Sequence, residues 1–365
     1  MVKYSDKEKL KGEFIVPEYM DAAFLTKPLE VKVLKEKVPK VGSKDVLVKI
    51  GAVGICGSDI HYYAHGHIGE RVVQYPHIQG HECAGVIVAI GDKVTRFKVG
   101  DRVAVEPGVS CMACEWCKEG RYNLCPDVQF LSTPPVKGAF VQYLSHREDF
   151  LYPIPDTLSF ELATLAEPLS VGIHAVKRGN LKPNSTVLIT GMGPVGLMAI
   201  VAAKSFGANQ IIVTDMEPFR LEAAKKLGAT NAIDISDSDV SQMVSRLTGG
   251  HGVDMVIETS GNEKALESSV KLTRRGGTIV AVGFPPANHV PLNITHMLQN
   301  EIDLLSVYRY INTYPTAIEI LNQVGNEVEH IITDKYTIYE IQEAMNQSYK
   351  NKEKSLKVMV YPNTK

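Results

Sequence analysis

The chain has 365 residues, of which 44% are hydrophobic and 22% charged, a composition typical of a soluble globular protein with two or three domains. Lys and Arg together number 39 and Asp and Glu 41, so the formal net charge is -2. This balance argues against a nucleic-acid binder and against attraction to an anionic membrane. The charged start has no apolar stretch of signal-peptide length, and the most apolar run, from Leu197, is far shorter than a membrane helix. We expect a cytoplasmic protein.

The first 150 residues or so predict a β-rich domain. They contain short apolar and β-branched runs that Gly and Pro interrupt at close intervals, among them VLVKIGAVGI, ECAGVIVAIGD, DRVAVEPG and GAFVQYL. Such runs are typical of strands joined by turns. We expect a small, irregular β-barrel or sandwich whose loops carry the polar residues.

From about Glu161 the pattern changes to helices that alternate with strands. Apolar residues at helical spacing come first, and short apolar strands then alternate with helical stretches rich in Ala and Leu. The expected strands are 187–190, 211–215, 231–235, 253–260, 277–283 and 302–307. Six strands with intervening helices indicate a doubly wound parallel sheet.

The tail after about Tyr308 leaves this alternation. It holds two helical patterns and a last strand at 356–362, and it is too short to form its own core. We therefore expect it to pack back on the first domain. The predicted division is a catalytic domain of residues 1–168 and 308–365 and a cofactor domain of residues 169–307.

A glycine motif marks the start of the predicted parallel sheet. Gly191, Gly193 and Gly196 form G-x-G-x-x-G between an apolar strand and a helix. The first glycine permits a tight turn, the second lets the backbone approach a pyrophosphate, and the third lets the helix pack on the strand. Asp215 ends the next strand, where a carboxylate binds ribose hydroxyls and repels the 2′-phosphate of NADP. The pattern predicts an NAD site, with Arg220 near the adenine; the alternative is an ordinary turn in which Asp215 caps a helix.

Four of the six cysteines lie close together in a C-x2-C-x2-C-x7-C pattern, at Cys111, Cys114, Cys117 and Cys125. In a reducing compartment such a cluster indicates metal binding rather than disulfides. Four thiolates on one loop can close a tetrahedral zinc shell, which leaves no open position and so predicts a structural ion. An iron–sulfur cluster is the alternative, since it is also held by four cysteines. A nucleic-acid-binding zinc finger is a further one, but no basic recognition helix follows.

A second group predicts an open metal site. GICGSDIHYY and GHECAG supply Cys56, His81 and Glu82, whose mixed sulfur, nitrogen and oxygen donors leave one coordination position free. This is the pattern of a catalytic zinc, which lowers the pKa of a bound water or alcohol. Asp59 is a candidate acceptor for the other ring nitrogen of His81. An isolated His or Cys is more often packed or exposed than a ligand, so the prediction depends on the combination with the dinucleotide motif.

Together these motifs make the chain resemble the zinc-dependent medium-chain dehydrogenases, and more narrowly their sorbitol (L-iditol 2-) dehydrogenase branch, which includes xylitol-oxidising relatives. The matching segments are GICGSDIHYY, GHECAG, DRVAVEPG, CMACEWC, GRYNLCPDVQF, STPP, AEPLSVGIHA, GMGPVGL, VTDMEPFRL and YRYINTYP. They extend from about residue 50 to about residue 315. The resemblance implies a GroES-like catalytic domain and a Rossmann cofactor domain, with the active site in the cleft between them.

The resemblance also implies roles for single residues. Cys56, His81 and Glu82 match the catalytic zinc ligands, with water as the fourth. Glu167 matches a carboxylate that binds this water and the substrate, in a place where related alcohol dehydrogenases have a cysteine ligand; as a bare residue it can equally be a helix-start carboxylate. Several animal sorbitol dehydrogenases lack the four-cysteine site, so this chain is more similar to bacterial and fungal members. We expect two zinc ions per subunit, although manganese or cobalt at the catalytic site stays open.

Further positions match proton relay, substrate and cofactor contacts. Ser58 and His61 occupy the relay positions, although His61 can equally serve packing. The polyol pocket is matched by Tyr62, Phe130, Thr133, Glu167, Arg309 and Tyr310. The cofactor contacts are matched by Gly191, Gly193, Val195, Gly196, Asp215, Arg220, Val282, Gly283, Phe284, Val307, Tyr308 and Arg309. The alternative for Arg309 and Tyr310 is surface or interdomain packing.

The sequence therefore predicts a dehydrogenase that passes hydride from C2 of a polyol to NAD and gives the ketose. A threonine or butanediol dehydrogenase of the same family is an alternative, against which Arg309 and Tyr310 argue. A non-catalytic binding protein on the same fold, as some lens crystallins are, is another, against which Cys56, His81 and Glu82 argue. The expected partner is a small polyol or ketose, with no nucleic acid and no membrane, and the resemblance implies a homotetramer.

Overall fold

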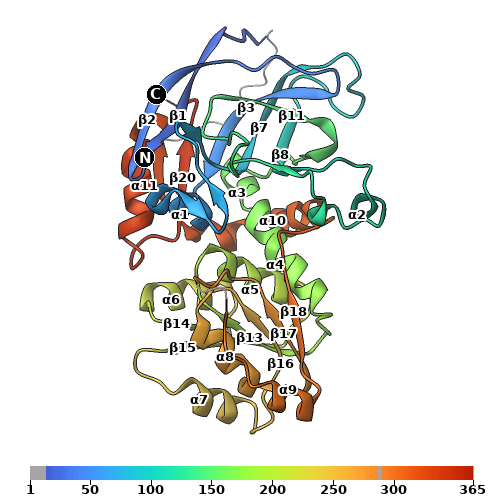
Figure 1. The fold of residues 1–365 in the computed structure, drawn as a ribbon, viewed down its shortest axis with the longest axis vertical. Coiled ribbons are helices and arrows are strands. Elements are labelled where there is room, and N and C mark those ends of the chain that lie inside the picture. Colours follow the sequence, from blue (N-terminus) through green and yellow to red (C-terminus); the bar gives the residue numbers. More distant parts are fainter. Residues whose placement is uncertain (1–13, 287–288, 365) are drawn as a thin grey trace.

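The computed structural model describes residues 14–286 and 289–364 and shows two parts stacked along the long axis (Figure 1). In that view the upper part consists mainly of strands, and the lower part holds a sheet with helices packed on it. Residues 1–13, on which the prediction of no signal peptide largely rests, lie outside the described residues. Within the described ranges, no helix combines the length and the apolar character that crossing a membrane requires.

The lower part contains a six-stranded sheet in the order β15-β14-β13-β16-β17-β18, and every pairing in it is parallel. Its strands are β13 (Thr186–Thr190), β14 (Gln210–Asp215), β15 (Asn231–Asp234), β16 (Val253–Glu258), β17 (Thr273–Ala281) and β18 (Asp303–Ser306). Its helices are α5 (Pro194–Ser205), α6 (Pro218–Leu227), α7 (Val240–Leu247), α8 (Glu263–Leu272) and α9 (Ile294–Asn300). The predicted doubly wound parallel sheet is confirmed, because helices cover the sheet and the central strands β13, β14 and β16 are accordingly buried over most of their length.

The chain leaves the central strand β13 first to one side and then to the other, so the strand order reverses between β13 and β16. Ligands bind at such a reversal, in the crevice outside the carboxyl ends of the strands. The connecting helices are delimited as the sequence indicates: α6 has Pro218 at its first position and ends at Gly228, whose φ of 111° is left-handed. The glycine motif thus lies at the edge of the sheet where a dinucleotide is expected.

The upper part is an irregular set of mostly antiparallel strands, as predicted for a β-rich region over the first 150 residues, and its last two strands pair in parallel. A seven-stranded sheet has the order β12-β8-β7-β3-β20-β19 with β11 paired to β3, and a three-stranded sheet has the order β2-β1-β6. The strands are β1 (Tyr19–Lys27), β2 (Glu30–Lys37), β3 (Asp45–Gly54), β6 (His77–Ile78), β7 (Glu82–Ile90), β8 (Arg102–Val105), β11 (Tyr143–Arg147), β12 (Leu151–Pro153), β19 (Ile332–Thr337) and β20 (Lys357–Tyr361). The C-terminal strands β19 and β20 complete the sheet of the N-terminal part, so the tail packs where it was predicted to pack.

Short elements and four longer helices complete the fold. They are β4 (His67–Ile68), β5 (Arg71–Val72), β9 (Gly108–Val109), β10 (Gln129–Phe130), α1 (Gly57–His65), α2 (Glu115–Lys118), α3 (Phe160–Thr164), α4 (Ala166–Arg178), α10 (Tyr314–Val328), α11 (Ile341–Lys350) and the 3-10 turns η1 (Tyr122–Leu124), η2 (Glu148–Phe150), η3 (Glu329–Ile331) and η4 (Ile338–Glu340).

One hydrophobic core runs across the junction of the two parts. It joins Leu169 and Ile173 of α4 and Leu197 of α5 to Ala84 of β7 and Leu321 of α10. The predicted domain boundary at residue 168 falls inside the first turn of α4, since this helix continues from Ala166 to Arg178. The division into 1–168, 169–307 and 308–365 therefore stays a prediction, and α4 is the element that connects the two parts.

Candidate active site

Three metal-ligating side chains meet where β3, β7 and α1 converge. Cys56 caps the N-terminus of α1, and His81 and Glu82 stand at the start of β7; their ligand atoms all lie within 4.8 Å of one another. Strand pairing places Glu82 opposite Gly54, and a Cβ at Gly54 would come within 2.2 Å of Glu82 Oε2. A glycine at position 54 therefore makes room for the Glu82 carboxylate. His81 and Glu82 are almost fully buried, while Cys56 is partly exposed.

Asp59 is buried beside His81 and holds the loop that carries the ligands. Its carboxylate accepts hydrogen bonds from the backbone N–H of Cys56 and Gly80 and from the Ser132 hydroxyl. His81 Nδ1 lies 3.6 Å from Asp59 Oδ1, which is too long for a hydrogen bond, and has no other partner among the described residues. The prediction that Asp59 faces the second ring nitrogen agrees with this placement, and a small shift would close the bond.

The donor set fits a zinc ion. A thiol, an imidazole and a carboxylate converge in a mostly buried place, and this three-ligand combination leaves one position free for water or substrate. Buried anionic donors are costly unless a cation compensates them, so a metal ion also answers an electrostatic need. Cys56, His81 and Glu82 are the residues that would hold it.

Lys357 is a member of this site that the sequence reasoning missed. Its fully buried ammonium group donates to both Glu82 oxygens, at 2.8 and 2.6 Å, and to the carbonyl oxygen of Ile55 at 3.2 Å. The signal was a lysine in the apolar strand KVMVY, where every other member is apolar or aromatic. This ion pair connects β20, the last strand of the chain, to Glu82, one of the predicted metal ligands.

Glu167 stands in the first turn of α4 and is almost fully buried. The Tyr310 hydroxyl donates to Glu167 Oε1 at 2.9 Å. Burial raises the pKa of Glu167 to about 7, the imidazole of His81 opposes this, and the charge of Glu82 adds to the rise. A cation between Cys56, His81 and Glu82 would lower this pKa again, so the value of about 7 describes the site without its metal ion.

A second buried carboxyl group, Glu106, lies behind Glu167. The hydroxyls of Tyr122 and Tyr152 donate to its two oxygens, both at 2.8 Å. Burial raises the pKa of Glu106 to about 7 in spite of these hydrogen bonds, and the charge of Glu167 raises it further. The sequence reasoning did not single out Glu106, because a glutamate at the end of the β-rich run DRVAVEPG carries no motif of its own.

The residues predicted for the polyol pocket fall into a connected group around Phe130. The Arg309 guanidinium lies 4.0 Å from the centre of the Phe130 ring, and that ring lies 5.6 Å from the His81 ring. Arg309 Nη1 is buried and has no hydrogen-bond partner among the described residues, so it can donate to a ligand. Tyr62 is buried on α1, and Thr133 contributes backbone hydrogen bonds to the turn after Phe130.

The two predicted relay residues both lie on α1. Ser58 is half-buried, and His61 is exposed, with its Nδ1 2.9 Å from the carbonyl oxygen of His67 and its ring against those of His65 and His67. His61 therefore lies at the solvent-facing end of the predicted relay. Their role in proton transfer stays a prediction.

The glycine motif has the geometry that a pyrophosphate requires. Gly191 has a φ of +84°, and a Cβ at Gly196 would come within 1.9 Å of the Gly191 carbonyl oxygen. Gly193 caps α5, and a Cβ there would meet nothing within 4 Å, so the space in front of the helix N-terminus is open. Asp215 accepts backbone N–H bonds from Met192 at 2.6 Å and from Glu217 at 2.9 Å.

The other predicted cofactor residues surround the same edge. Val195 follows in the first turn of α5, and Gly283 fits so closely that a Cβ would come within 2.2 Å of the Gly261 nitrogen. Phe284 is exposed, and the backbone N–H of Val307 donates to Ala281. Val282 and Tyr308 are half-buried beside them. Arg220 donates from Nε to the Lys352 carbonyl oxygen at 3.1 Å, so its guanidinium also reaches the C-terminal tail.

The four-cysteine lobe, residues 111–125, brings all four of its sulfur atoms within 4.8 Å of one another. The Cys111–Cys117 and Cys114–Cys117 sulfurs are 3.9 and 3.5 Å apart. Four thiolates around one zinc ion stand about 3.8 Å apart, which follows from Zn–S bonds of about 2.3 Å. An iron–sulfur cluster would spread its cysteines over several irons, so the spacing favours a single tetrahedral ion. Backbone N–H groups, first that of Ala113, lower the pKa of Cys111 to about 6, which favours the thiolate.

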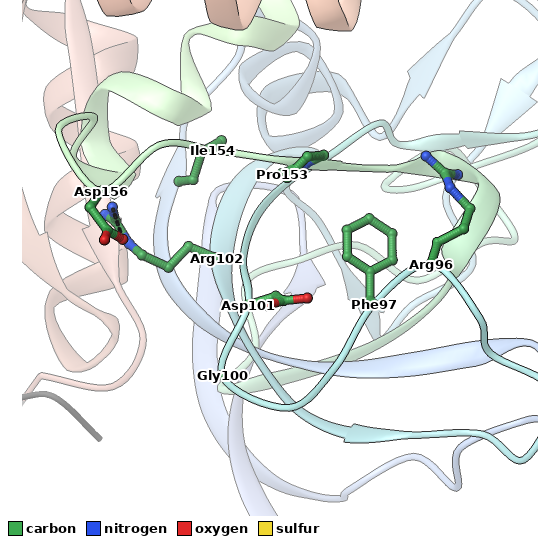
Figure 2. A pocket seen from close by; sticks show the side chains of 8 residues that line it. All are labelled: Arg96, Phe97, Gly100, Asp101, Arg102, Pro153, Ile154 and Asp156. Carbon is green, nitrogen blue, oxygen red and sulfur yellow. Dashed lines mark ion pairs between the residues drawn. The ribbon is translucent and has the colours of Figure 1, made fainter. Parts of the chain in front are cut away.

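A surface pocket of about 330 Å³ lies elsewhere, at the opposite end of β8 (Figure 2). Arg96 and Arg102 stand on its two sides, and Arg102 points away to pair with Asp156. Arg102 also donates to two backbone carbonyls and stacks on Phe160. None of the residues that line this pocket belongs to the predicted site, so its walls serve the fold.

Comparison with known proteins shows which family the chain belongs to. Residues 194–323 match the model of the zinc-binding dehydrogenases, and residues 42–156 match that of the alcohol dehydrogenase GroES-like domain. A sorbitol dehydrogenase of Bacillus subtilis is 55% identical over 348 residues, which cover 95% of this chain and 99% of that protein. The chain belongs to the sorbitol dehydrogenase family of zinc-binding dehydrogenases.

Solved structures of other dehydrogenases share the fold over nearly the whole chain. An Escherichia coli oxidoreductase of unknown specificity has a TM-score of 0.90 and 37% identity, covering 94% of this chain and 99% of its own. A 2R,3R-butanediol dehydrogenase of Bacillus subtilis has a TM-score of 0.86 and 29% identity, covering 94% and 100%. The GroES-like and Rossmann architecture expected from the sequence is thereby confirmed.

The two cysteine groups predict separate consequences of metal loss. Cys125→Ser is expected to reduce the zinc content from about two ions per chain to about one and to lower the temperature of unfolding, since a structural ion stabilises its loop. Cys56→Ser should lose the other ion and the activity but keep the fold. Cys83→Ala is the matched control, because this buried cysteine belongs to neither group. Elemental analysis with thermal unfolding measures both, and two bound ions in Cys125→Ser would contradict the assignment.

The Lys357–Glu82 pair predicts a strong asymmetry between single and double substitution. Lys357→Met leaves the Glu82 carboxylate buried without its cation, and we expect a loss of about 3 kcal/mol in the free energy of unfolding. The double variant Lys357→Met/Glu82→Gln removes both charges and should recover most of that loss. Thermal unfolding of the metal-free proteins checks this, and equal stabilities of wild type and Lys357→Met would show that the pair is dispensable.

Glu106 predicts a pH-dependent stability. Burial raises its pKa in the folded chain from the ordinary glutamate value of 4.5 to about 7, so the folded state binds one more proton than the unfolded state between these pH values. Its contribution to stability is therefore lost as pH rises from about 5 through 7, by up to about 3 kcal/mol. Glu106→Gln cannot titrate, so its unfolding temperature relative to wild type should rise between pH 5.5 and 8. A constant difference over that range would contradict the raised pKa.

Proposed function

We propose that the chain is an NAD-dependent dehydrogenase that oxidises a polyol such as sorbitol or xylitol at C2 to the ketose. The observation that carries this proposal is one connected group. In it Glu167 is held by Tyr310, Arg309 has a free buried donor, and the Phe130 ring joins Arg309 to His81 of the open metal site. Relatives named sorbitol dehydrogenase at 55% and 39% identity support the same substrate class.

The chain has residues suited to both activation of the alcohol and removal of its proton. A zinc ion held by Cys56, His81 and Glu82 would lower the pKa of the alcohol oxygen. Glu167 can accept the alcohol proton at its carboxylate, because the Tyr310 hydroxyl holds the group in place and a cation held by Cys56, His81 and Glu82 would keep the carboxyl group ionised. Ser58 and His61 on α1 offer a second route for the proton toward solvent.

Substrate selection follows from the polar groups around Phe130. Arg309 Nη1 can donate to a hydroxyl of a polyol, whereas a plain aliphatic alcohol would leave this buried donor unpaired. The Phe130 ring contacts both the Arg309 guanidinium and the His81 ring. Arg309 could also pair with the second hydroxyl of 2,3-butanediol or with the carboxylate of threonine, so the relatives named sorbitol dehydrogenase are what favour a polyol over these substrates. A purely binding role would have no use for the open coordination position.

NAD is favoured over NADP by Asp215. Its carboxylate is fixed by the backbone N–H of Met192 and Glu217 at the end of β14, where the ribose of a dinucleotide lies in this fold. It can accept from both ribose hydroxyls and would repel a 2′-phosphate. The open space at Gly193 and the N-terminus of α5 provide the place for the pyrophosphate.

The proposed assembly is a homotetramer. We propose that two of its subunits contact each other through the edge strand β18 of the parallel sheet. β18 ends the parallel sheet, and Leu304 on it, with Ile294 and Leu298 of α9, exposes apolar surface. A second copy can pair with the same edge about a two-fold axis. Leu304→Lys should shift the sedimentation coefficient to that of a smaller species, and an unchanged one would count against this contact.

The six unpaired cysteines support a reducing compartment such as the cytoplasm, which cell fractionation would test.

The direct test of the function is a substrate panel. NADH formation is followed by absorbance with sorbitol, xylitol, 2,3-butanediol and threonine, each with NAD and with NADP. Polyols with NAD should give the highest kcat/KM, and Glu167→Gln should reduce kcat by about a hundredfold or more, since a general base is lost. Turnover confined to butanediol or threonine would overturn the substrate class but leave the metal sites untouched.

The glycine motif offers a matched pair of variants. Gly193→Ala places its methyl group in open space, so the protein should fold normally but bind NAD at least tenfold more weakly, because the methyl group blocks the pyrophosphate. Gly196→Ala meets backbone at 1.9 Å and should lower the unfolding temperature as well. NAD titration and thermal unfolding distinguish the two, and unchanged NAD affinity in Gly193→Ala would place the cofactor elsewhere.

A further inference from the structure

The pocket segment, residues 308–312, has a backbone that needs external support. Arg309 and Asn312 have φ values of +57° and +50°, in the left-handed region that non-glycine residues rarely occupy. Such conformations persist where the surrounding structure holds them, and they are frequent at functional sites. This short segment connects β18 to α10 and carries both Arg309 and Tyr310.

The four-cysteine lobe holds the pocket segment at both ends. The Asn123 side-chain amide donates to the Tyr308 carbonyl oxygen at 2.8 Å. The backbone N–H of Asn312 donates to the Tyr122 hydroxyl, also at 2.8 Å. Neither bond follows from a motif, because each joins residues more than 180 positions apart. Two adjacent lobe residues thus bracket the segment that carries Arg309 and Tyr310.

The Tyr122 hydroxyl is itself fixed from behind. It donates to Glu106 Oε1 at 2.8 Å, so its lone pairs are left to accept the N–H of Asn312. Glu106 is buried and also accepts the Tyr152 hydroxyl, and the Tyr152 ring stacks on Tyr314 at the start of α10. One hydroxyl group therefore connects a buried carboxyl group to the backbone of the pocket segment.

We propose that Tyr122 and Asn123 are positioning residues that set the preference of the site for polyhydroxylated alcohols over simple ones. They act through the pocket segment, in which Arg309 lies on the Phe130 ring and Tyr310 holds Glu167. The inference rests on the proposed polyol activity, and it assigns to the four-cysteine lobe a role in substrate choice beyond stabilising the fold.

The expected effect is selective. When the Asn312 N–H or the Tyr308 carbonyl oxygen loses its partner, Arg309 is no longer held at the place of the additional hydroxyls. Substrates that use Arg309 then bind more weakly, whereas a simple secondary alcohol such as 2-butanol does not need this contact. The predicted catalytic zinc ligands Cys56, His81 and Glu82 and the glycine motif make no hydrogen bond to Tyr122 or Asn123 in the described residues, so the places for the metal ion and the cofactor stay unchanged.

The test compares Tyr122→Phe and Asn123→Ala with two control tyrosines in the zinc-loaded enzyme. The ratio of kcat/KM for the polyol to that for 2-butanol should fall about tenfold in both variants, through KM rather than kcat. Tyr143→Phe removes a hydroxyl that makes no hydrogen bond in the described residues and should leave the ratio unchanged. Tyr152→Phe removes the other donor to Glu106 but does not touch the pocket segment, and its effect should be clearly smaller.

Hydrogen exchange gives a readout that does not depend on turnover. The peptide that contains residues 308–312 should exchange faster in Tyr122→Phe, since the Asn312 amide has lost its acceptor. Unchanged exchange and an unchanged ratio in both lobe variants would overturn the proposal, as would an equal fall of the ratio in Tyr152→Phe. If the wild type oxidises no polyol, the proposed function fails, and unchanged exchange would then overturn the positioning role separately. If Tyr122→Phe does not fold, Asn123→Ala decides.

Discussion

The structure depends on compensating the Glu82 carboxylate, which is buried where the two parts of the chain meet. A buried carboxylate is stable only with a positive partner, and Lys357 provides one from the last strand of the chain. This requirement explains why the C-terminal tail returns to the first sheet: β20 pairs with β3 and brings the ammonium group to Glu82. The same anionic place would hold a metal ion together with Cys56 and His81. Both the return of the tail and the proposed metal site therefore depend on compensating the negative charge of the buried Glu82 carboxylate.

Three buried carboxyl groups lie at or behind this site, each with its own partner. Glu82 is paired with Lys357, Glu167 accepts the Tyr310 hydroxyl, and Glu106 accepts two further tyrosine hydroxyls. Glu167 and Glu106 have no cationic side chain as a hydrogen-bond partner in the described residues, and burial raises the pKa of each to about 7 in the chain without metal. Hydrogen bonds from tyrosines to buried carboxyl groups are therefore how this fold keeps proton-accepting groups beside a metal site.

The sequence predicted the parts of the fold that arise from local patterns. The six parallel strands, the glycine turn and the stop of α6 at Gly228 follow from periodicity and turn chemistry, and the structure has them. The four cysteines were recognisable because their spacing is local. The grouping of Cys56 with His81 and Glu82 depended on their combination with the dinucleotide motif and then on the resemblance, since the 24 residues between Cys56 and His81 carry no spacing rule. The roles of Ser58, His61 and the cofactor residues remain predictions.

What the sequence could not indicate are contacts between distant residues with no motif. Lys357 is 275 positions from Glu82, and only the register of β20 against β3 brings them together. Tyr122 and Asn312 are 190 positions apart, and Glu106 lies in an unremarkable strand end. The predicted boundary at residue 168 falls within α4 because helical periodicity shows where a helix lies but not which domain it serves. In each case tertiary packing, rather than local propensity, decides the outcome.

The most direct measurement of the central claim is a titration of the metal-free enzyme with Co²⁺, followed by both the thiolate-to-cobalt absorption and NADH formation with sorbitol. Cobalt substitutes for zinc at sulfur and nitrogen ligands and reports them spectroscopically. The account predicts two equivalents per chain, one with a strong four-thiolate band and one with a weak band that disappears in Cys56→Ser. Activity should return only with the ion that gives the weak band. Full activity with that site empty, or a single equivalent at saturation, would contradict the account.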